Sequence, residues 1–124
     1  MQKTTRFLAI LLTLFLLVPV QADTSQLVGT WVATREDGAS TTWQFNADGT
    51  MSAEFDGMEG FKGTWTLNTD VTPHQLDVIA DDETVETIVE FTDKDTFRLE
   101  IGTANPGDPR PTEFSDMAAT FKRQ

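Results

Sequence analysis

The chain has 124 residues, no cysteine, one histidine and a formal net charge of −11. Without cysteine it can form no disulfide and cannot use a thiol as nucleophile or metal ligand. The acidic balance argues against nucleic acid or an anionic lipid surface as a partner.

The N-terminal segment has the three parts of a secretory signal peptide. Lys3 and Arg6 precede an apolar run over residues 7–18, and the small residues Val20 and Ala22 suit a cleavage site. The run is shorter than the roughly 20 residues that a membrane-spanning helix needs. We therefore expect a signal peptide that is removed on export.

The expected domain organisation is a signal peptide over residues 1–22 and one exported domain over residues 23–124, periplasmic or extracellular. Loss of Lys3 and Arg6 would take the formal charge from −11 to −13. A single domain of this size can bury a self-supporting core. Its stability must come from packing and strand pairing, because no disulfide is available.

Eight β-strands are predicted in the exported part by runs of alternating apolar and polar residues. In chain order they cover Leu27–Arg35, Ser40–Ala47, Thr50–Phe55, Phe61–Asn68, Gln75–Ala80, Val85–Thr92, Thr96–Ile101 and Met117–Arg123. Asp48-Gly49 between the second and third runs is a strong hairpin signal. A Gly-rich connection is expected over residues 56–60, and a long loop with three prolines precedes the last strand. No sustained helical period follows the signal peptide, so no helix longer than a single turn is expected.

The alternation indicates one buried face and one solvated face. The predicted buried face carries Trp31, Ala33, Trp43, Phe45, Met51, Ala53, Phe55, Phe61, Trp65, Leu67, Leu76, Val78, Val89, Phe91, Phe97, Leu99, Ile101, Ala119 and Phe121. Ile79 and Ile88 are exceptions on the polar face, which also carries Glu100. The sequence predicts an all-β, eight-stranded antiparallel up-and-down barrel, because closing the sheet removes two exposed edges. A β-sandwich is the alternative architecture.

Gly29-Thr30-Trp31 at the start of the first strand resembles the lipocalin signature. In lipocalins the tryptophan plugs one end of the barrel, and a basic residue near the end of the last strand packs on it. Arg123 has the inward parity of Phe121, whereas Lys122 points outward. The resemblance therefore implies that Gly29, Trp31 and Arg123 close one end of a lipocalin-like barrel.

A closer resemblance covers nearly the whole exported part. It is to the planctomycete-type lipocalin-like domains of uncharacterised exported bacterial proteins, and it is carried by residues 27–31, 63–67, 72–73, 110–114 and 122–123. The segment Arg110-Pro111-Thr112-Glu113-Phe114 is the most specific of these. Members often carry a cysteine shortly before it, where this chain has Ala104-Asn105-Pro106. The resemblance implies a fold and no particular activity.

The residue inventory favours a binding protein over an enzyme. His74 is the only histidine, and no serine lies in a strand-to-helix elbow that would suit a nucleophile. A transition-metal site normally needs two or more His or Cys ligands. Asp81-Asp82-Glu83 could hold a hard cation, although a solvated turn is the favoured interpretation. No catalytic residue, metal or cofactor is expected.

Two features remain as candidates for binding. The candidate ligand pocket is formed by aromatic residues of the buried face, namely Trp43, Phe45, Phe55, Trp65, Phe91 and Phe97. Arg110, which lies between two prolines, could bind an anion or form a structural ion pair. The expected function is an exported lipocalin-like binding module for a small apolar ligand. The alternative is an envelope protein-interaction or inhibitor-like domain with a packed barrel and no ligand.

Overall fold

The computed structural model describes residues 24–124, so the predicted signal peptide lies outside the described residues. A short 3₁₀-helix, η1 (Ser25–Leu27), precedes eight strands. They are β1 (Gly29–Thr34), β2 (Ser40–Phe45), β3 (Thr50–Phe55), β4 (Met58–Asn68), β5 (His74–Ala80), β6 (Glu83–Asp93), β7 (Thr96–Glu100) and β8 (Ala119–Arg123). Within the described part, no helix is long and apolar enough to cross a membrane.

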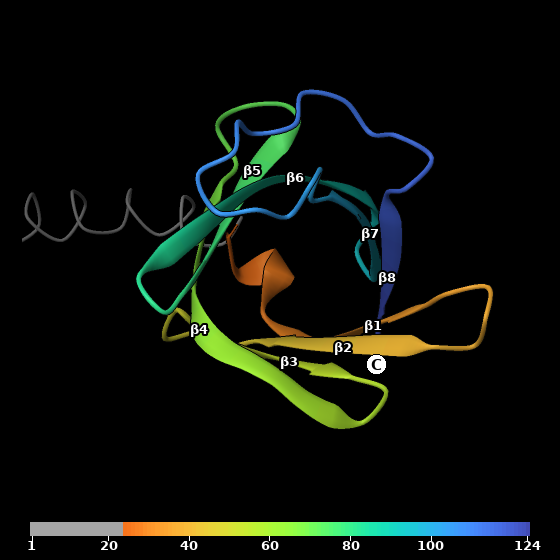
Figure 1. Cartoon of the computed structure of the whole chain (residues 1–124). Helices are drawn as coiled ribbons and strands as arrows, with labels where there is room; N and C mark the ends of the chain where they lie inside the picture. The colour runs from red at the N-terminus through yellow and green to blue at the C-terminus, as the bar shows by residue number, and fades with distance from the viewer. Residues whose placement is uncertain (1–23) are drawn as a thin grey trace, which may run out of the picture.

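The eight strands form one closed antiparallel barrel (Figure 1). Each strand pairs with its neighbours in the chain, and β8 returns to β1 through the pairs Trp31↔Arg123 and Val32↔Lys122. The predicted up-and-down, lipocalin-like barrel is confirmed, and the alternative of a β-sandwich is wrong. Closure gives the edges of the first and last strands hydrogen-bonding partners within the chain.

Several predicted strand boundaries are wrong by one to three residues, and two of these differences affect the ends of the barrel. Leu27 belongs to η1 rather than to the first strand, and its side chain is fully buried. The Gly-rich connection expected over residues 56–60 is a two-residue turn, because β4 already begins at Met58. A bulge explains the difference: Ala53 pairs with Phe61 but the next residue pairs with Glu59, so Gly60 has no opposite partner. The predicted Asp48-Gly49 hairpin is confirmed, with Gly49 at a positive φ of 89°.

The core fills the inside of the barrel with the inward side chains of alternating positions. Neighbouring aromatic rings touch in an unbroken series, with centroids between 4.7 and 5.9 Å apart, in the order Trp65, Phe45, Trp43, Phe121, Phe97 and Trp31. Such tilted and stacked contacts add to the free energy of burial. The aromatic series therefore crosses the interior of the barrel and joins β4 and β2 to β8, β7 and β1.

Part of the outer wall is covered as well. The β7–β8 connection, residues 101–118, runs across the β5 and β6 side of the barrel (Figure 1), and we call it the strap. Ile88 and Glu100 face outward and pair with each other across β6 and β7, yet they are only 2% and 5% exposed. The expectation that Glu100 is solvated is therefore wrong. The strap also gives the apolar Ile88 a buried environment on the polar face.

Candidate binding site

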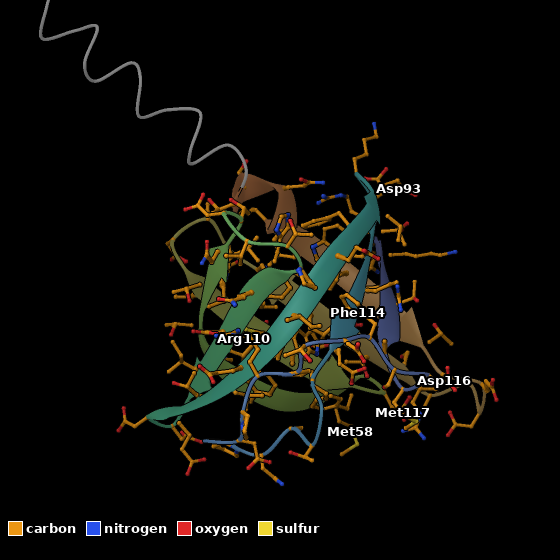
Figure 2. All side chains as sticks on the ribbon, turned by 90° about the horizontal axis from the view of Figure 1, so that it is seen from above. Met58, Asp93, Arg110, Phe114, Asp116 and Met117 are labelled. Carbon is orange, nitrogen blue, oxygen red and sulfur yellow. The ribbon has the colours of Figure 1, made fainter. Side chains whose placement is uncertain are left out.

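The connections between strands divide into two sets at opposite ends of the barrel. The closed end has η1, the C-terminus and the connections 46–49, 69–73 and 94–95. The open end has the connections 35–39, 56–57 and 81–82 and the strap. Figure 2 shows Asp93 near the closed end and Met58 and Met117 at the opposite end.

Trp31 and Arg123 cover the closed end. The guanidinium carbon of Arg123 lies 4.2 Å from the centre of the Trp31 ring, and Trp31 Nε1 donates a hydrogen bond of 2.8 Å to the Leu27 carbonyl. Arg123 donates to the carbonyl oxygens of Val28 at 2.9 Å, Gln26 at 3.0 Å and Lys94 at 3.2 Å, and to Asp95 Oδ1 at 2.9 Å. The contact expected between Trp31 and Arg123 is present, and it ties η1 and the β6–β7 turn to the last strand.

Gly29 makes this closure sterically feasible. Its φ of +136° is rarely adopted by residues with a side chain, and a Cβ there would lie 2.6 Å from Arg123 Nη1. A larger residue would therefore displace the guanidinium from the Trp31 ring. The three residues that the sequence assigned to barrel closure lie together at one end.

The six residues of the predicted pocket are not all brought together. Trp43, Phe45, Trp65 and Phe97 are buried in the core, and Phe91 is half-buried against it. Their rings contact one another or other core residues. Phe55 lies apart at the open end with 45% of its surface exposed, so its expected burial is wrong. Five of these residues thus belong to the packed interior of the barrel, and the sixth, Phe55, lies at its open end.

The inward side chains become smaller toward the open end. Each of four strands has a large inward residue and, two positions nearer the open end, a small one. The pairs are Trp31 and Ala33 on β1, Trp43 and Thr41 on β2, Met51 and Ala53 on β3, and Phe121 and Ala119 on β8. These four strands are adjacent in the barrel. On these four strands the inward side chains are therefore large at the level of Trp43 or nearer the closed end, and small from that level to the open end. Most of the core lies toward the closed end.

Trp43 marks the boundary between these levels. Its side chain is 7% exposed and packs against Phe61 and Phe121, with ring centroids 6.1 and 5.3 Å away. Its Nε1 is buried and has no hydrogen-bond partner among the described residues. An unpaired buried N–H costs on the order of 1–3 kcal/mol. The two other indole N–H groups, on Trp31 and Trp65, donate to backbone carbonyls.

Large apolar side chains are exposed around the open end. Met117 is 85% exposed, Met58 73%, Phe55 45% and Ile101 38%, and we call these four residues the apolar rim. Phe55 and Met58 are paired across β3 and β4, whereas Ile101 and Met117 lie just beyond the β7–β8 ladder. Gly60 makes room for Phe55, because a Cβ there would lie 2.3 Å from the Phe55 ring. Exposed apolar residues in such a group mark interaction surfaces more often than isolated ones do.

Arg110 fastens the strap to the outer wall. Its guanidinium pairs with Asp77 on β5 at 2.7 Å and with Glu86 on β6 at 3.3 Å, and it donates to the Thr87 carbonyl at 2.8 Å. Farther along the strap, Phe114 lies under the guanidinium of Arg98 at 4.5 Å. Of the two roles considered for Arg110, these contacts are those of the structural ion pair.

Glu100 provides a second attachment for the strap. Its carboxylate accepts hydrogen bonds from the backbone N–H and hydroxyl of Ser115, at 2.7 and 2.6 Å, and from the N–H of Gly102 at 3.2 Å. Burial by itself raises the pKa of Glu100, but these hydrogen bonds and the nearby Arg98 outweigh burial and lower it below the ordinary value. The carboxylate is therefore ionised at neutral pH, and it holds the start and end of the strap together.

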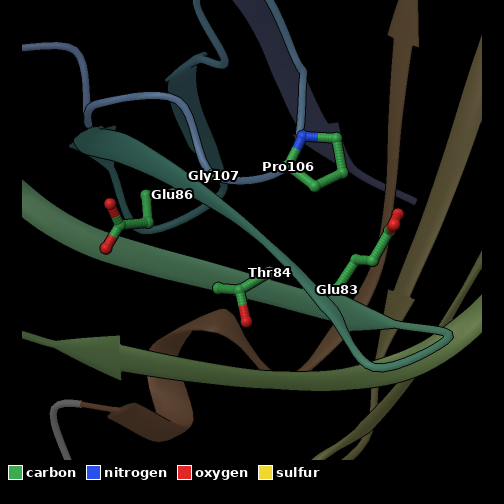
Figure 3. Close-up of a pocket in the computed structure, with 5 residues that line it drawn as sticks. All are labelled: Glu83, Thr84, Glu86, Pro106 and Gly107. Atoms are coloured by element: carbon green, nitrogen blue, oxygen red, sulfur yellow. The ribbon is translucent and has the colours of Figure 1, made fainter.

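A shallow pocket of about 550 Å³ lies outside the barrel. It lies between β6 and the strap (Figure 3), and its lining residues are Glu83, Thr84, Glu86, Pro106 and Gly107. It contains none of the residues that the sequence assigned to a ligand pocket. Within residues 24–124, no three His, Asp or Glu side chains converge to hold a metal ion, and His74 Nδ1 lies 2.8 Å from the Val71 carbonyl.

The sequence interpretation missed Met58 and Met117 as components of the open end. Met58 fell in a segment read as a connection, and Met117 lay at the uncertain start of the last strand. A usable signal was present, because Ile101 and Met117 continue the inward parity of Leu99 and Ala119 past the last paired residues. Apolar residues that extend a buried pattern beyond the end of a strand indicate a rim.

The arrangement brings together an apolar rim, an inner wall of small side chains and a buried indole N–H without a partner. Comparison of the sequence with models of known protein families finds no match, and comparison with curated proteins finds none either.

Proposed function

We propose that this chain is an exported, non-catalytic binding module whose open barrel end takes a small apolar ligand. The apolar rim is the observation that carries the proposal. Met58 and Met117 expose most of their side chains to water, and outside the rim Val71 is the one large apolar residue among the described residues that is exposed rather than buried or half-buried. Covering these side chains with a ligand would be favourable by roughly 25 cal/mol for each Å² of apolar surface removed from water.

The level below the rim supports the same function. The side chains above Trp43 are small, so a ligand that reaches below the rim would meet fewer bulky groups there than toward the closed end. The unpartnered Trp43 N–H would gain a partner if the ligand carried an acceptor oxygen or retained a water molecule there. Export is supported by the predicted signal peptide alone.

Titration with a neutral apolar dye, Nile red, tests the proposal on protein purified from cells that express the full chain. We expect saturable binding, and we expect Met58→Ser or Met117→Ser to weaken it about five- to tenfold, which corresponds to about 1 kcal/mol of lost apolar contact. Val71→Ser is the matched control, because Val71 is exposed at the closed end. Dye binding that is absent, or equal in all four proteins, would contradict the proposal.

A second candidate function is supported by the packing of the interior. Trp31, Phe45, Phe97 and Phe121 are fully buried inside the barrel, which leaves the rim rather than a deep cavity as the binding surface. The domain would then be an envelope protein-interaction or inhibitor-like module without a small ligand. Tryptophan fluorescence separates the two functions. A small ligand should change the emission of the protein and leave that of Trp43→Phe much less affected, whereas a partner on the rim alone should not.

A further inference from the structure

The connections at the open end are strongly acidic. They carry the carboxylates of Glu36, Asp37, Asp56, Asp81, Asp82, Asp108, Glu113 and Asp116 and the bases Arg35 and Arg110. The connections at the closed end carry the carboxylates of Asp48, Asp70 and Asp95 and the base Lys94. The formal charge of the connections is −6 at the open end, from eight carboxylates and two bases, and −2 at the closed end, from three carboxylates and one base. Residues 110–114 of the strap lie over the outer wall (Figure 2), and the other charges of the open end lie in the rest of the strap and in the turns beside the rim.

The bases near the open end neutralise only a small part of this charge. Arg35 pairs with Asp37 in its own turn at 3.4 Å. Arg110 is engaged with Asp77 and Glu86, whose carboxylates lie on the β5–β6 wall rather than on the rim. No ion pair among the described residues involves the strap carboxylates Glu113 and Asp116. Figure 2 shows Asp116 at the same end as Met58 and Met117.

We propose that the ligand of the open end is a cationic amphiphile, a small molecule with an apolar chain or ring system and a positively charged group. The inference rests on the proposed function and adds the charge of the ligand to it. The apolar part would lie on the rim side chains, and the cation would lie among the surrounding carboxylates. Charge complementarity of this kind selects ligands by sign, because an anionic head group would be repelled by the same carboxylates.

The chemistry of the rim suits such a ligand. Methionine side chains are flexible and polarizable, so Met58 and Met117 can adapt to apolar groups of different shape. The exposed face of Phe55 can attract a cation through its ring quadrupole. The Trp43 N–H is a donor, so it would be satisfied by an acceptor group of the ligand and not by the cation itself.

Three amphiphiles with the same twelve-carbon tail test the charge of the ligand. Dodecyltrimethylammonium is cationic, dodecyl maltoside neutral and dodecyl sulfate anionic. Each is titrated by calorimetry below its micelle-forming concentration into protein purified from cells that express the full chain. We expect the cation to bind about tenfold more tightly than the neutral compound at low salt, and the anion to bind most weakly. Raising the salt should weaken binding of the cation and leave the neutral compound nearly unchanged.

The double variant Glu113→Gln/Asp116→Asn locates the effect. It removes two carboxylates from the strap near Met117 and should lower the affinity for dodecyltrimethylammonium about threefold or more, with no loss for dodecyl maltoside. The matched control is Asp70→Asn/Asp93→Asn, which removes the same charge from the closed end at two carboxylates that form no ion pair among the described residues. Because all four positions are exposed, folding should be preserved in both variants.

The outcomes separate the charge of the ligand from the proposed function. Equal binding of all three amphiphiles, or tightest binding of dodecyl sulfate, would overturn the cationic ligand and leave the apolar binding site standing. An equal loss of affinity in both double variants would likewise overturn it, because the effect would then come from net charge alone. Failure of all three amphiphiles and of Nile red to bind would overturn both proposals.

Discussion

The two ends of this barrel use the same kind of side chain for different purposes. At the closed end, Trp31 is fully buried, its N–H is paired, and Arg123 covers its ring while satisfying three backbone carbonyls. Trp43, which pairs with Trp31 across β1 and β2, has an unpaired N–H, and at the open end Met58 and Met117 are left in water. Buried polar groups that are paired and a large apolar ring that is covered indicate a part that serves stability. The opposite condition indicates a part that serves binding.

The comparison also explains why a small domain without disulfides can leave one end unfinished. The aromatic series from Trp65 to Trp31 concentrates the core toward the closed end, and the strap adds a buried layer on the β5–β7 wall. Burial of large aromatic groups there contributes enough free energy that the rim can remain exposed. Stability and binding are thereby carried by residues that can be changed independently.

The largest effect is expected from Trp31→Ala. The substitution removes a fully buried ring in contact with Phe97 and leaves the Arg123 guanidinium without the surface on which it lies. The free energy of unfolding in urea should fall by about 3–5 kcal/mol. Met117→Ala at the open end should change it by no more than about 0.5 kcal/mol. Similar losses for the two variants would erase the distinction between the ends.

A second prediction concerns the stacking of Arg123. Arg123→Met should lower the free energy of unfolding by about 1–3 kcal/mol, because it leaves several backbone carbonyls with fewer donors. A double-mutant cycle with Trp31→Phe should give a coupling of about 0.5–2 kcal/mol. Lys122→Met is the control, since Lys122 pairs with Val32 but faces outward. Coupling of the same size with Lys122 would contradict a specific contact.

The smallest of the three effects is expected at the strap. Glu100→Gln should lower the free energy of unfolding by about 1–2 kcal/mol at neutral pH, because the charged acceptor of the Ser115 and Gly102 hydrogen bonds is lost. The pKa of Glu100 is lower in the folded protein than its ordinary value of 4.5. The stabilisation is therefore complete above that value and is lost as the pH falls through the folded-state pKa.

Urea denaturation at a series of pH values checks this. The difference in the free energy of unfolding between Glu100→Gln and the parent protein should become smaller as the pH is lowered below 4.5. Limited proteolysis at neutral pH should cleave the variant first within residues 101–118, because the strap loosens before the barrel opens. A gap that stays constant with pH would mean that the carboxylate charge does not hold the strap.

The barrel itself was largely predictable from local patterns. Alternation placed Trp43, Phe45, Trp65 and Phe97 on one face, and the parity of Phe121 placed Arg123 beside Trp31 once the barrel was closed. The exceptions occur where a distant segment changes the environment. Ile88 and Glu100 could be understood only after the strap was found over them, since residues about 15 or more positions away cover the outer face.

By itself, the sequence determined the number and order of the strands, the face that each strand buries and the residues available to close the barrel. These features depend on a two-residue period and on turn residues, which are local. Only the tertiary structure decided which inward residues meet solvent. That depends on how far each strand extends toward the open end, on the bulge that brings Phe55 to the rim and on the path of the strap. Phe55 and Phe45 share the same parity in the sequence, but one lies in the rim and the other in the core.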